Sequence, residues 1–310
     1  MDNITTLEDV FNRVDALSKN CTDKLIPIKA ISFDRLDTIK IENEPHKLRP
    51  VAQRSMAYRL GVPFQYIERC PVEIQFLNLN YWIKKEKNEE MFLRFDGDEV
   101  RAIFTPKYKP VDNFEILERL DSLGIKPDIL VQCYLDAEFM TLSVPDANKT
   151  FFIKKGDQLT PGISISNSEV GLASLSISSF ILRLVCTNGL ISKVKAFAAS
   201  FRHISTKILD HLPKLLTDVS NRVEGQKKQF QISLESKVND PISTLNNFNR
   251  QFQLGKSEKE AVDWGWGYEA GDTMFNIINA YTKASQCNGL SAESSFNLQS
   301  VGGHILELVN

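Results

Sequence analysis

One segment near the middle of the chain constrains the fold more than any other. Isoleucine and serine alternate from Ile163 to Ser166, and this period of two predicts a short strand with one apolar face. A polar turn follows as far as Gly171. Apolar residues then predominate from Ser174 to Ile191, which predicts a helix that is apolar almost all round and stops at Asn188-Gly189. We therefore expect a strand, a polar turn and a buried helix in that order.

A single cation, Arg183, interrupts this apolar run. A buried guanidinium is costly unless a carboxylate neutralises it, and Glu169 in the preceding turn is a candidate partner. The alternative is that Arg183 has a functional role, such as binding a ligand. Both interpretations of Arg183 remain open from the sequence.

The composition is that of a soluble globular protein. Apolar residues make up 42% of the 310 residues and charged residues 25%, a balance that excludes an intrinsically disordered chain. The net charge of −2 provides no overall basic field, so a polyanionic partner would have to meet a local basic patch. Because no apolar run reaches membrane-spanning length and no basic-then-apolar leader opens the chain, we expect a cytoplasmic protein with no membrane partner.

The pattern of the cysteines also favours a cytoplasmic protein. They are odd in number, scattered, and never spaced as CxxC, which predicts reduced thiols in an intracellular protein. The five are Cys21, Cys70, Cys133, Cys186 and Cys287.

Hydrophobic patterning divides the chain into three regions: a mainly helical N-terminal region at 1–90, an α+β core at 91–205 and a helical C-terminal region at 206–310. The predicted fold class is therefore α+β, with a sheet of antiparallel β-hairpins covered by one helix. Helices are predicted at residues 5–19, 48–60, 71–87, 112–120, 206–238, from 257 onward, 272–287 and 291–309. Strands are predicted at residues 26–33, 38–41, 92–95, 100–105, 129–135, 138–144, 151–153 and 162–166. The break at 61–63 between two helices also has the outline of a helix-turn-helix, which is common in any helical cluster.

Catalytic patterns are scarce. The four histidines show no metal-ligand spacing, and no nucleophile elbow, phosphate-binding loop or dinucleotide fingerprint occurs. A two-metal site assembled from Glu99, Asp112, Asp136 and Glu138 is conceivable, but any chain of mixed charge permits such a set. We expect no enzymatic activity, no catalytic residue, no metal and no cofactor.

Two clusters combine cations with aromatic rings, which is the chemistry that holds single-stranded nucleic acid. The alternative for each is a solvated loop beside core aromatics. The first contains Arg101, Lys107, Tyr108 and Lys109, and the second contains Lys193, Lys195, Arg202 and His203, with Phe197 and Phe201 between them. The run from Trp264 to Tyr268 alternates aromatics with glycine, which favours packing at an interface over a stacking platform.

Several stretches resemble one family. Residues 100–113, 166–171 and 182–190 are similar to the phage/plasmid-like family catalogued as domain of unknown function nine-three-two, and residues 60–63 and 275–282 fit the same pattern. Members of that family are carried by phages, plasmids and prophages. The resemblance covers most of the chain and implies an origin in a mobile element, but it implies no activity.

A weaker resemblance concerns the segment described first. The strand at 162–166, the turn through Glu169 and Gly171, and a helix ending at residues 188–190 resemble the core of the Rad52-type single-strand annealing proteins. Those proteins form rings or filaments and hold a strand in a basic groove. This chain departs from their pattern because Arg183 is the one cation in that helix.

Together these observations predict a mobile-element protein of DNA recombination that binds and anneals single-stranded DNA as a homo-oligomer. Arg101, Lys107 and Lys109 would meet phosphates and Tyr108 would stack on a base. Lys193, Lys195 and Arg202 would extend the groove, while Arg183 would hold the strand–helix unit through a carboxylate such as Glu169. The alternatives are an anti-defence or other interaction protein that binds a host protein, and a metal-dependent nucleic-acid enzyme.

Overall fold

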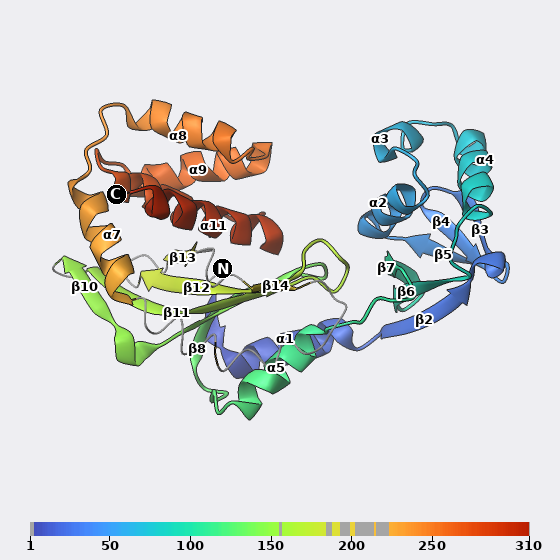
Figure 1. Ribbon diagram of the computed structural model, residues 1–310, viewed down its shortest axis with the longest axis horizontal. Helices are drawn as coiled ribbons and strands as arrows, with labels where there is room; N and C mark the ends of the chain where they lie inside the picture. The colour runs from blue at the N-terminus through green and yellow to red at the C-terminus, as the bar shows by residue number, and fades with distance from the viewer. Residues whose placement is uncertain are drawn as a thin grey trace.

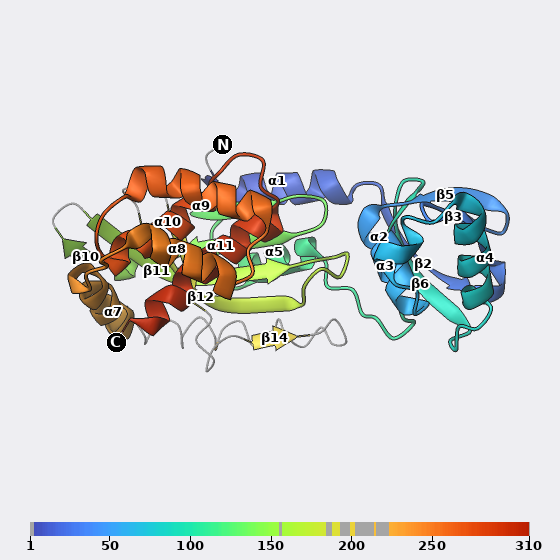
Figure 2. The same ribbon diagram turned by 90° about the horizontal axis from the view of Figure 1, so that it is seen from above.

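The chain forms two lobes that lie side by side along the long axis of the molecule (Figures 1 and 2). The computed structural model describes residues 3–154, 157–183, 188–192, 199–201, 214 and 223–309. The small lobe comprises residues 21–104, and the large lobe comprises the described residues before and after them.

The large lobe is built on an antiparallel sheet. Its strands run in the order β1-β8-β9-β11-β12-β13, while β10 pairs with β11 and β14 pairs with β12. The strands are β1 (Ile4–Thr6), β8 (Leu130–Leu135), β9 (Met140–Pro145), β10 (Phe151–Lys154), β11 (Asp157–Asn167), β12 (Leu175–Arg183), β13 (Asn188–Ser192) and β14 (Ala199–Phe201).

The buried helix predicted from Ser174 to Ile191 is wrong, because Leu175–Arg183 is strand β12. This strand pairs with β11 over eight residues, from Leu159↔Arg183 to Ser166↔Ser176. Side chains on both faces of β12 are buried. The apolar run that begins at Phe180 does not distinguish such a doubly covered strand from a buried helix, although Leu175 to Ser178 alternate as strand residues do.

Helices cover both faces of this sheet. Helices α1 (Leu7–Ser18) and α5 (Asn113–Ser122) pack on one face, where apolar residues of β8, β9, β11 and β12 meet them. The C-terminal helices pack on the other face, over Leu159, Ile181 and Leu190. These helices are α7 (Val223–Glu235), α8 (Pro241–Gln251), α9 (Lys256–Glu269), α10 (Met274–Ala284) and α11 (Ala292–Leu308). The predicted helical C-terminal region is thus confirmed over the residues that the structure describes.

The small lobe has a mixed sheet of order β2-β6-β7-β5-β4-β3, in which β5 and β7 are parallel. Its strands are β2 (Cys21–Pro27), β3 (Ile31–Arg35), β4 (Thr38–Ile41), β5 (Glu44–Leu48), β6 (Glu90–Asp96) and β7 (Glu99–Phe104), and its helices are α2 (Pro50–Arg59), α3 (Phe64–Ile67) and α4 (Val72–Ile83). One-turn 3₁₀ helices are η1 (Ile28–Ala30) in this lobe and η2 (Ala147–Lys149) in the large lobe. The hairpin predicted around residues 96–98 is confirmed as β6–β7.

The sheet pairs strands from both sides of residue 90, since β2 pairs with β6 along its whole length. The two hairpins that patterning placed in one core lie in different sheets: β6–β7 in the small lobe and β8–β9 in the large lobe. Each lobe therefore has its own apolar core.

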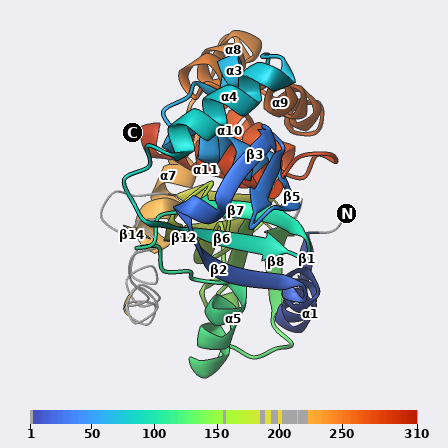
Figure 3. The same ribbon diagram turned by 90° about the vertical axis from the view of Figure 1, so that its right-hand side faces the viewer.

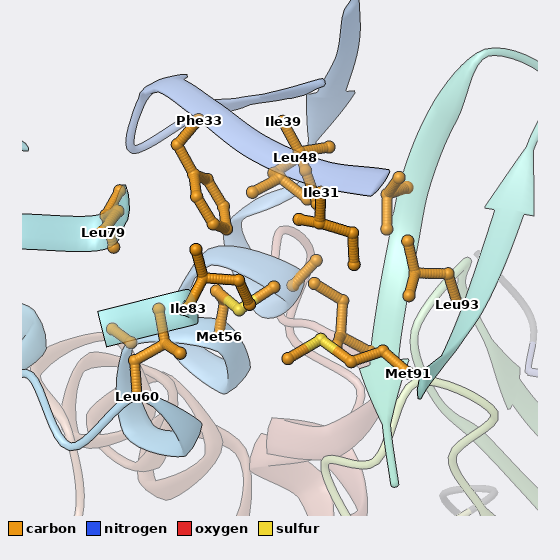
Figure 4. Packing of buried hydrophobic residues seen from close by; sticks show 14 of the residues in the cluster. Ile31, Phe33, Ile39, Leu48, Met56, Leu60, Leu79, Ile83, Met91 and Leu93 are labelled. Atoms are coloured by element: carbon orange, nitrogen blue, oxygen red, sulfur yellow. The ribbon is translucent and has the colours of Figure 1, made fainter. Parts of the chain in front are cut away.

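Helix α4 covers the edge of the small sheet. Its inner face inserts Leu79 and Ile83 against Phe33 of β3 (Figure 4). The amide of Asn80 bonds the backbone of the same strand, accepting from Phe33 N at 2.9 Å and donating to Phe33 O at 2.7 Å. Asn80 thereby supplies part of the hydrogen bonding that a further strand would give, which protects an edge that is otherwise prone to pairing with other chains.

In the part of the chain that the structure describes, no helix combines the length and the apolar character that crossing a bilayer requires.

Candidate functional site

Three chain segments meet where the two lobes join. The first leads from α1 into β2, the second comprises residues 105–112 between β7 and α5, and the third is the turn at 168–174 between β11 and β12. The first two are the links that cross between the lobes in Figure 1. The second and third overlap the sequence stretches 100–113 and 166–171, so the fold brings these two stretches together.

Glu169 is the centre of this junction. Its carboxylate accepts a hydrogen bond from Arg101 Nη1 at 2.8 Å and another from the backbone N–H of Asn113 at 2.7 Å. The second bond satisfies an amide in the first turn of α5, where a negative charge is favoured by the helix dipole. Glu169 thus ties a turn of the large sheet to β7 of the small lobe and to α5.

A second arginine, Arg94 of β6, spans the same junction. It is only 2% exposed and donates to Asp23 at 2.9 Å, to Asp112 at 2.5 Å and to the backbone oxygen of Glu169 at 3.2 Å. Burial opposes the charge of this guanidinium, but the carboxylates of Asp112 and Asp23 outweigh it and raise the pKa of Arg94. The buried cation is therefore fully ionised and neutralised by carboxylates from β2 and from the 105–112 connection.

Tyr108 lies inside the junction. Its ring stacks on that of Phe104, with centroids 3.7 Å apart and an interplanar angle of 2°. Burial raises the pKa of the Tyr108 hydroxyl well above its usual range. Gly171 packs on the same Phe104: it has φ +87°, and a Cβ built there would lie 2.7 Å from Phe104 Cε1. A glycine is needed at Gly171 for both reasons.

A cavity of about 330 Å³ opens beside the two arginines. The charged side chains that line it are Arg94, Arg101, Asp15, Asp23, Asp112 and Glu169. Arg101 Nε is buried here without a hydrogen-bond partner. Carboxylates outnumber guanidiniums around the cavity, so its electrostatics disfavour a phosphate. Cys21 lies on the same wall, where burial raises the pKa of its thiol and keeps it in the weakly nucleophilic protonated form.

The predicted site residues of the first cluster divide into two groups. Arg101 is 5% exposed and paired with Glu169, so its charge is buried. Tyr108 is half-buried, and one face of its ring is covered by Phe104. Lys107 and Lys109 are exposed on either side of Tyr108. Neither lysine forms an ion pair with the carboxylates that the structure describes. Lys107 and Lys109 are thus the members of this cluster whose charges are exposed.

Arg183 has partners other than the predicted Glu169. It donates through Nε and Nη2 to the two carboxylate oxygens of Asp157, each at 2.8 Å, and through Nη1 to Glu269 of α9 at 3.0 Å. Its guanidinium also lies 5.0 Å from the ring centre of Phe275. The prediction that a buried carboxylate neutralises Arg183 is therefore confirmed, because Asp157 and Glu269 are both buried. The named partner Glu169 is wrong, since it pairs with Arg101. Arg183 joins β12 to β11 and to the C-terminal helices.

The second predicted cluster, with Lys193, Lys195 and Arg202, lies outside the described residues.

The aromatic–glycine run lies in α9. Gly265 faces α10, and a Cβ built there would lie 2.4 Å from Ala280 O, so the glycine allows the two helices to approach closely. Trp266 packs into the helical core, while Lys283 of α10 lies 5.5 Å from the ring centre of Trp264 and 5.3 Å from that of Tyr268. The run therefore forms an interface between two helices of one chain.

Sequence patterns identify buried arginines more readily than the carboxylates that pair with them. Arg94 is not among the predicted site residues. Its position between Leu93 and Phe95 of a predicted hairpin, a cation within an apolar segment, is nevertheless the same pattern as that of Arg183. Its carboxylate partners, Asp23 and Asp112, lie 71 and 18 residues away. No local pattern links residues at such distances.

Within the residues that the structure describes, no group of three or more histidine, cysteine, aspartate or glutamate side chains is arranged to hold a metal ion. The junction is thus a network of paired charges with an exposed pair of lysines beside it. In comparisons with known proteins, no protein-family model, no curated protein and no solved structure matches this chain.

Proposed function

We propose that this chain is a phage- or plasmid-type protein that binds single-stranded DNA, promotes annealing without bond chemistry, and acts as an oligomer. The observation that supports the proposal is the exposed pair Lys107 and Lys109 on the connection between the lobes. Their ammonium groups are free to neutralise phosphates, which supplies most of the affinity in sequence-independent DNA binding.

The local structure holds these lysines in place. Pro106 and Pro110 flank the pair and restrict the backbone, and Tyr108 between them is anchored on Phe104. Pro106, Tyr108 and Pro110 are partly buried, whereas Lys107 and Lys109 between them are exposed. The two lysines therefore project from a backbone segment that its neighbours hold in place. A fixed support reduces the conformational entropy that the segment loses on binding. Arg101, Tyr108 and Arg183 support the fold in this proposal, and Lys193, Lys195 and Arg202 remain proposed phosphate contacts.

Fluorescence anisotropy with labelled single-stranded and duplex oligonucleotides tests the proposal. The variant Lys107→Glu/Lys109→Glu should bind at least tenfold more weakly and should flatten the plot of log K against log salt by about 1.4, since each single-strand phosphate contact contributes about 0.7.

The matched control is Lys256→Glu/Lys259→Glu on α9, where both lysines are exposed and the change in net charge is identical. This variant should bind DNA nearly as well as the unmodified chain. Equal losses in the two variants would indicate a general charge effect. Binding that does not occur even at low salt would refute the proposal.

A second candidate function is binding to another protein, and the exposed apolar side chains of α4 favour it. The two functions differ in their response to salt, because counterion release weakens DNA binding steeply while an apolar interface is much less sensitive.

A further inference from the structure

The outer face of α4 is unusually apolar for a surface. Half of the large hydrophobic side chains that are exposed in the described part of the chain lie between residues 58 and 82. On α4 itself, Val72, Ile74, Phe76, Leu77, Tyr81 and Trp82 are between 37% and 61% exposed. A concentration of exposed apolar side chains on one helix is typical of an interaction site.

These residues are not displaced core residues. The inner face of α4 already packs against the small sheet through Leu79 and Ile83, and Asn80 and Gln75 bond the backbone of the β3 region. At 100° per residue, Ile74, Leu77 and Tyr81 fall on the opposite side of the helix from Leu79, and Glu73 and Lys84 lie together on one flank of that outer face. We call these five outer residues the α4 stripe.

The position of α4 leaves the stripe accessible. Helix α4 lies at the end of the molecule farthest from the C-terminal helices (Figures 1 and 2), and it faces the viewer when that end is turned forward (Figure 3). A large partner could therefore reach it without meeting the large lobe.

We propose that the α4 stripe is a self-association surface, in which the α4 helices of two copies pack antiparallel about a two-fold axis. The charges of the stripe support a second copy as the occupant: Glu73 is in the first turn of α4 and Lys84 follows its last turn. In an antiparallel pair centred between residues 78 and 79, Glu73 of each copy lies opposite Lys84 of the other. The same symmetry places Leu77 of each copy within one residue of Tyr81 of the other. The stripe is thus complementary to itself in both charge and apolar character, which an isologous interface requires.

The surface is short, since a 12-residue helix is about 18 Å long. We therefore expect a weak dimer that forms with increasing concentration. A two-fold contact closes on two copies, so a ring or filament would need a second, different interface. This inference deepens the proposed oligomer and rests on that proposal, but its test uses the protein alone, without DNA.

Sedimentation velocity of the full chain over a range of concentrations tests the surface. The Leu77→Glu variant should remain monomeric where the unmodified chain dimerises. Leu130→Glu is the matched control, because Leu130 of β8 is 59% exposed and Leu77 is 61% exposed. The control should dimerise like the unmodified chain. A chain that stays monomeric at every concentration, or a dimer that tolerates Leu77→Glu, would overturn the proposal.

Charge exchange tests the antiparallel arrangement. Glu73→Lys and Lys84→Glu should each weaken the dimer about tenfold, because every contact occurs twice in a two-fold interface. The double variant Glu73→Lys/Lys84→Glu should recover the original affinity within about twofold. A double variant as weak as the single ones would contradict the antiparallel pairing. Lys107→Glu/Lys109→Glu should leave the dimer unchanged, so failure of DNA binding and failure of self-association are measured separately.

Discussion

Glu169 shows how one residue can connect three distant segments. It lies in a turn of the large sheet, yet it neutralises Arg101 of the small lobe and accepts the backbone N–H of Asn113. The side chains of both Arg101 and Glu169 are about nine-tenths buried. Removing one partner from a buried pair leaves an uncompensated charge, which costs far more than losing an exposed pair.

Glu169→Gln should therefore lower the free energy of unfolding by about 3 kcal/mol, measured by urea denaturation. Glutamine can still accept from Asn113, so the loss isolates the missing charge. Glu99→Gln is the control, because Glu99 pairs with Arg49 and Lys47 while one-third exposed, and its loss should cost about 1 kcal/mol or less. Similar losses in the two variants would show that Arg101 is not electrostatically dependent on Glu169.

At the scale of secondary structure, the sequence predicts amphipathic elements better than buried ones. The helix expected at 5–19 is confirmed as α1, because its apolar residues Leu7, Val10 and Val14 lie on one face. The strand expected at 38–41 is confirmed as β4. The helix predicted from Ser174 to Ile191 is wrong because the apolar residues Phe180 to Leu182 outweighed the strand-like alternation from Leu175 to Ser178, and β12 is buried on both faces.

Helix α4 is attached to strand β3 by hydrogen bonds between Asn80 and the backbone of Phe33. Asn80→Ala removes two hydrogen bonds to the backbone of Phe33 and should lower the free energy of unfolding by about 1–3 kcal/mol. Asn78→Ala is the matched control, since Asn78 bonds the carbonyl of Ile74 in its own helix. Both substitutions raise helix propensity equally, so the difference in urea midpoint reports the bonds to β3. Equal midpoints would mean that the edge of the sheet does not depend on Asn80.

At the scale of the whole molecule, buried tyrosines set the upper limit of pH stability. Burial raises the pKa of Tyr134 to about 12 and raises the pKa of Tyr108 and Tyr281 further above the usual value of 10.0. As pH rises past 10, the unfolded chain loses these protons before the folded chain does. Their contribution to stability is complete below pH 10 and declines above it, by up to about 1.4 kcal/mol per pH unit for each tyrosine.

Urea denaturation between pH 9 and about 11.5, together with tyrosinate absorbance, measures this effect. The free energy of unfolding should fall with pH, and part of the absorbance rise should coincide with unfolding. Tyr134→Phe should reduce the slope above pH 10. Complete ionisation of all seven tyrosines in a chain that keeps its native near-ultraviolet circular dichroism would contradict the prediction.

The division of the chain into two lobes could not be predicted from local sequence patterns. Local periodicity identified the hairpins at 92–105 and 129–144 but not the sheets to which they belong. That choice depends on long-range pairing: β2 with β6 in one sheet and β1 with β8 in the other. The polar network was hidden for the same reason, because Arg101 and Glu169 meet only when both lobes have folded.

The insertion of the small lobe between α1 and α5 has a consequence for synthesis on the ribosome. Strand β1 and helix α1 emerge before the small lobe, but their partner β8 emerges only after the entire small lobe. At about 5–20 residues per second, this delay is roughly 6–25 seconds. The small lobe can fold during that time, while the apolar face of α1, with Leu7, Val10 and Val14, has no partner surface. Helix α1 is thus a suitable binding segment for a chaperone during that interval.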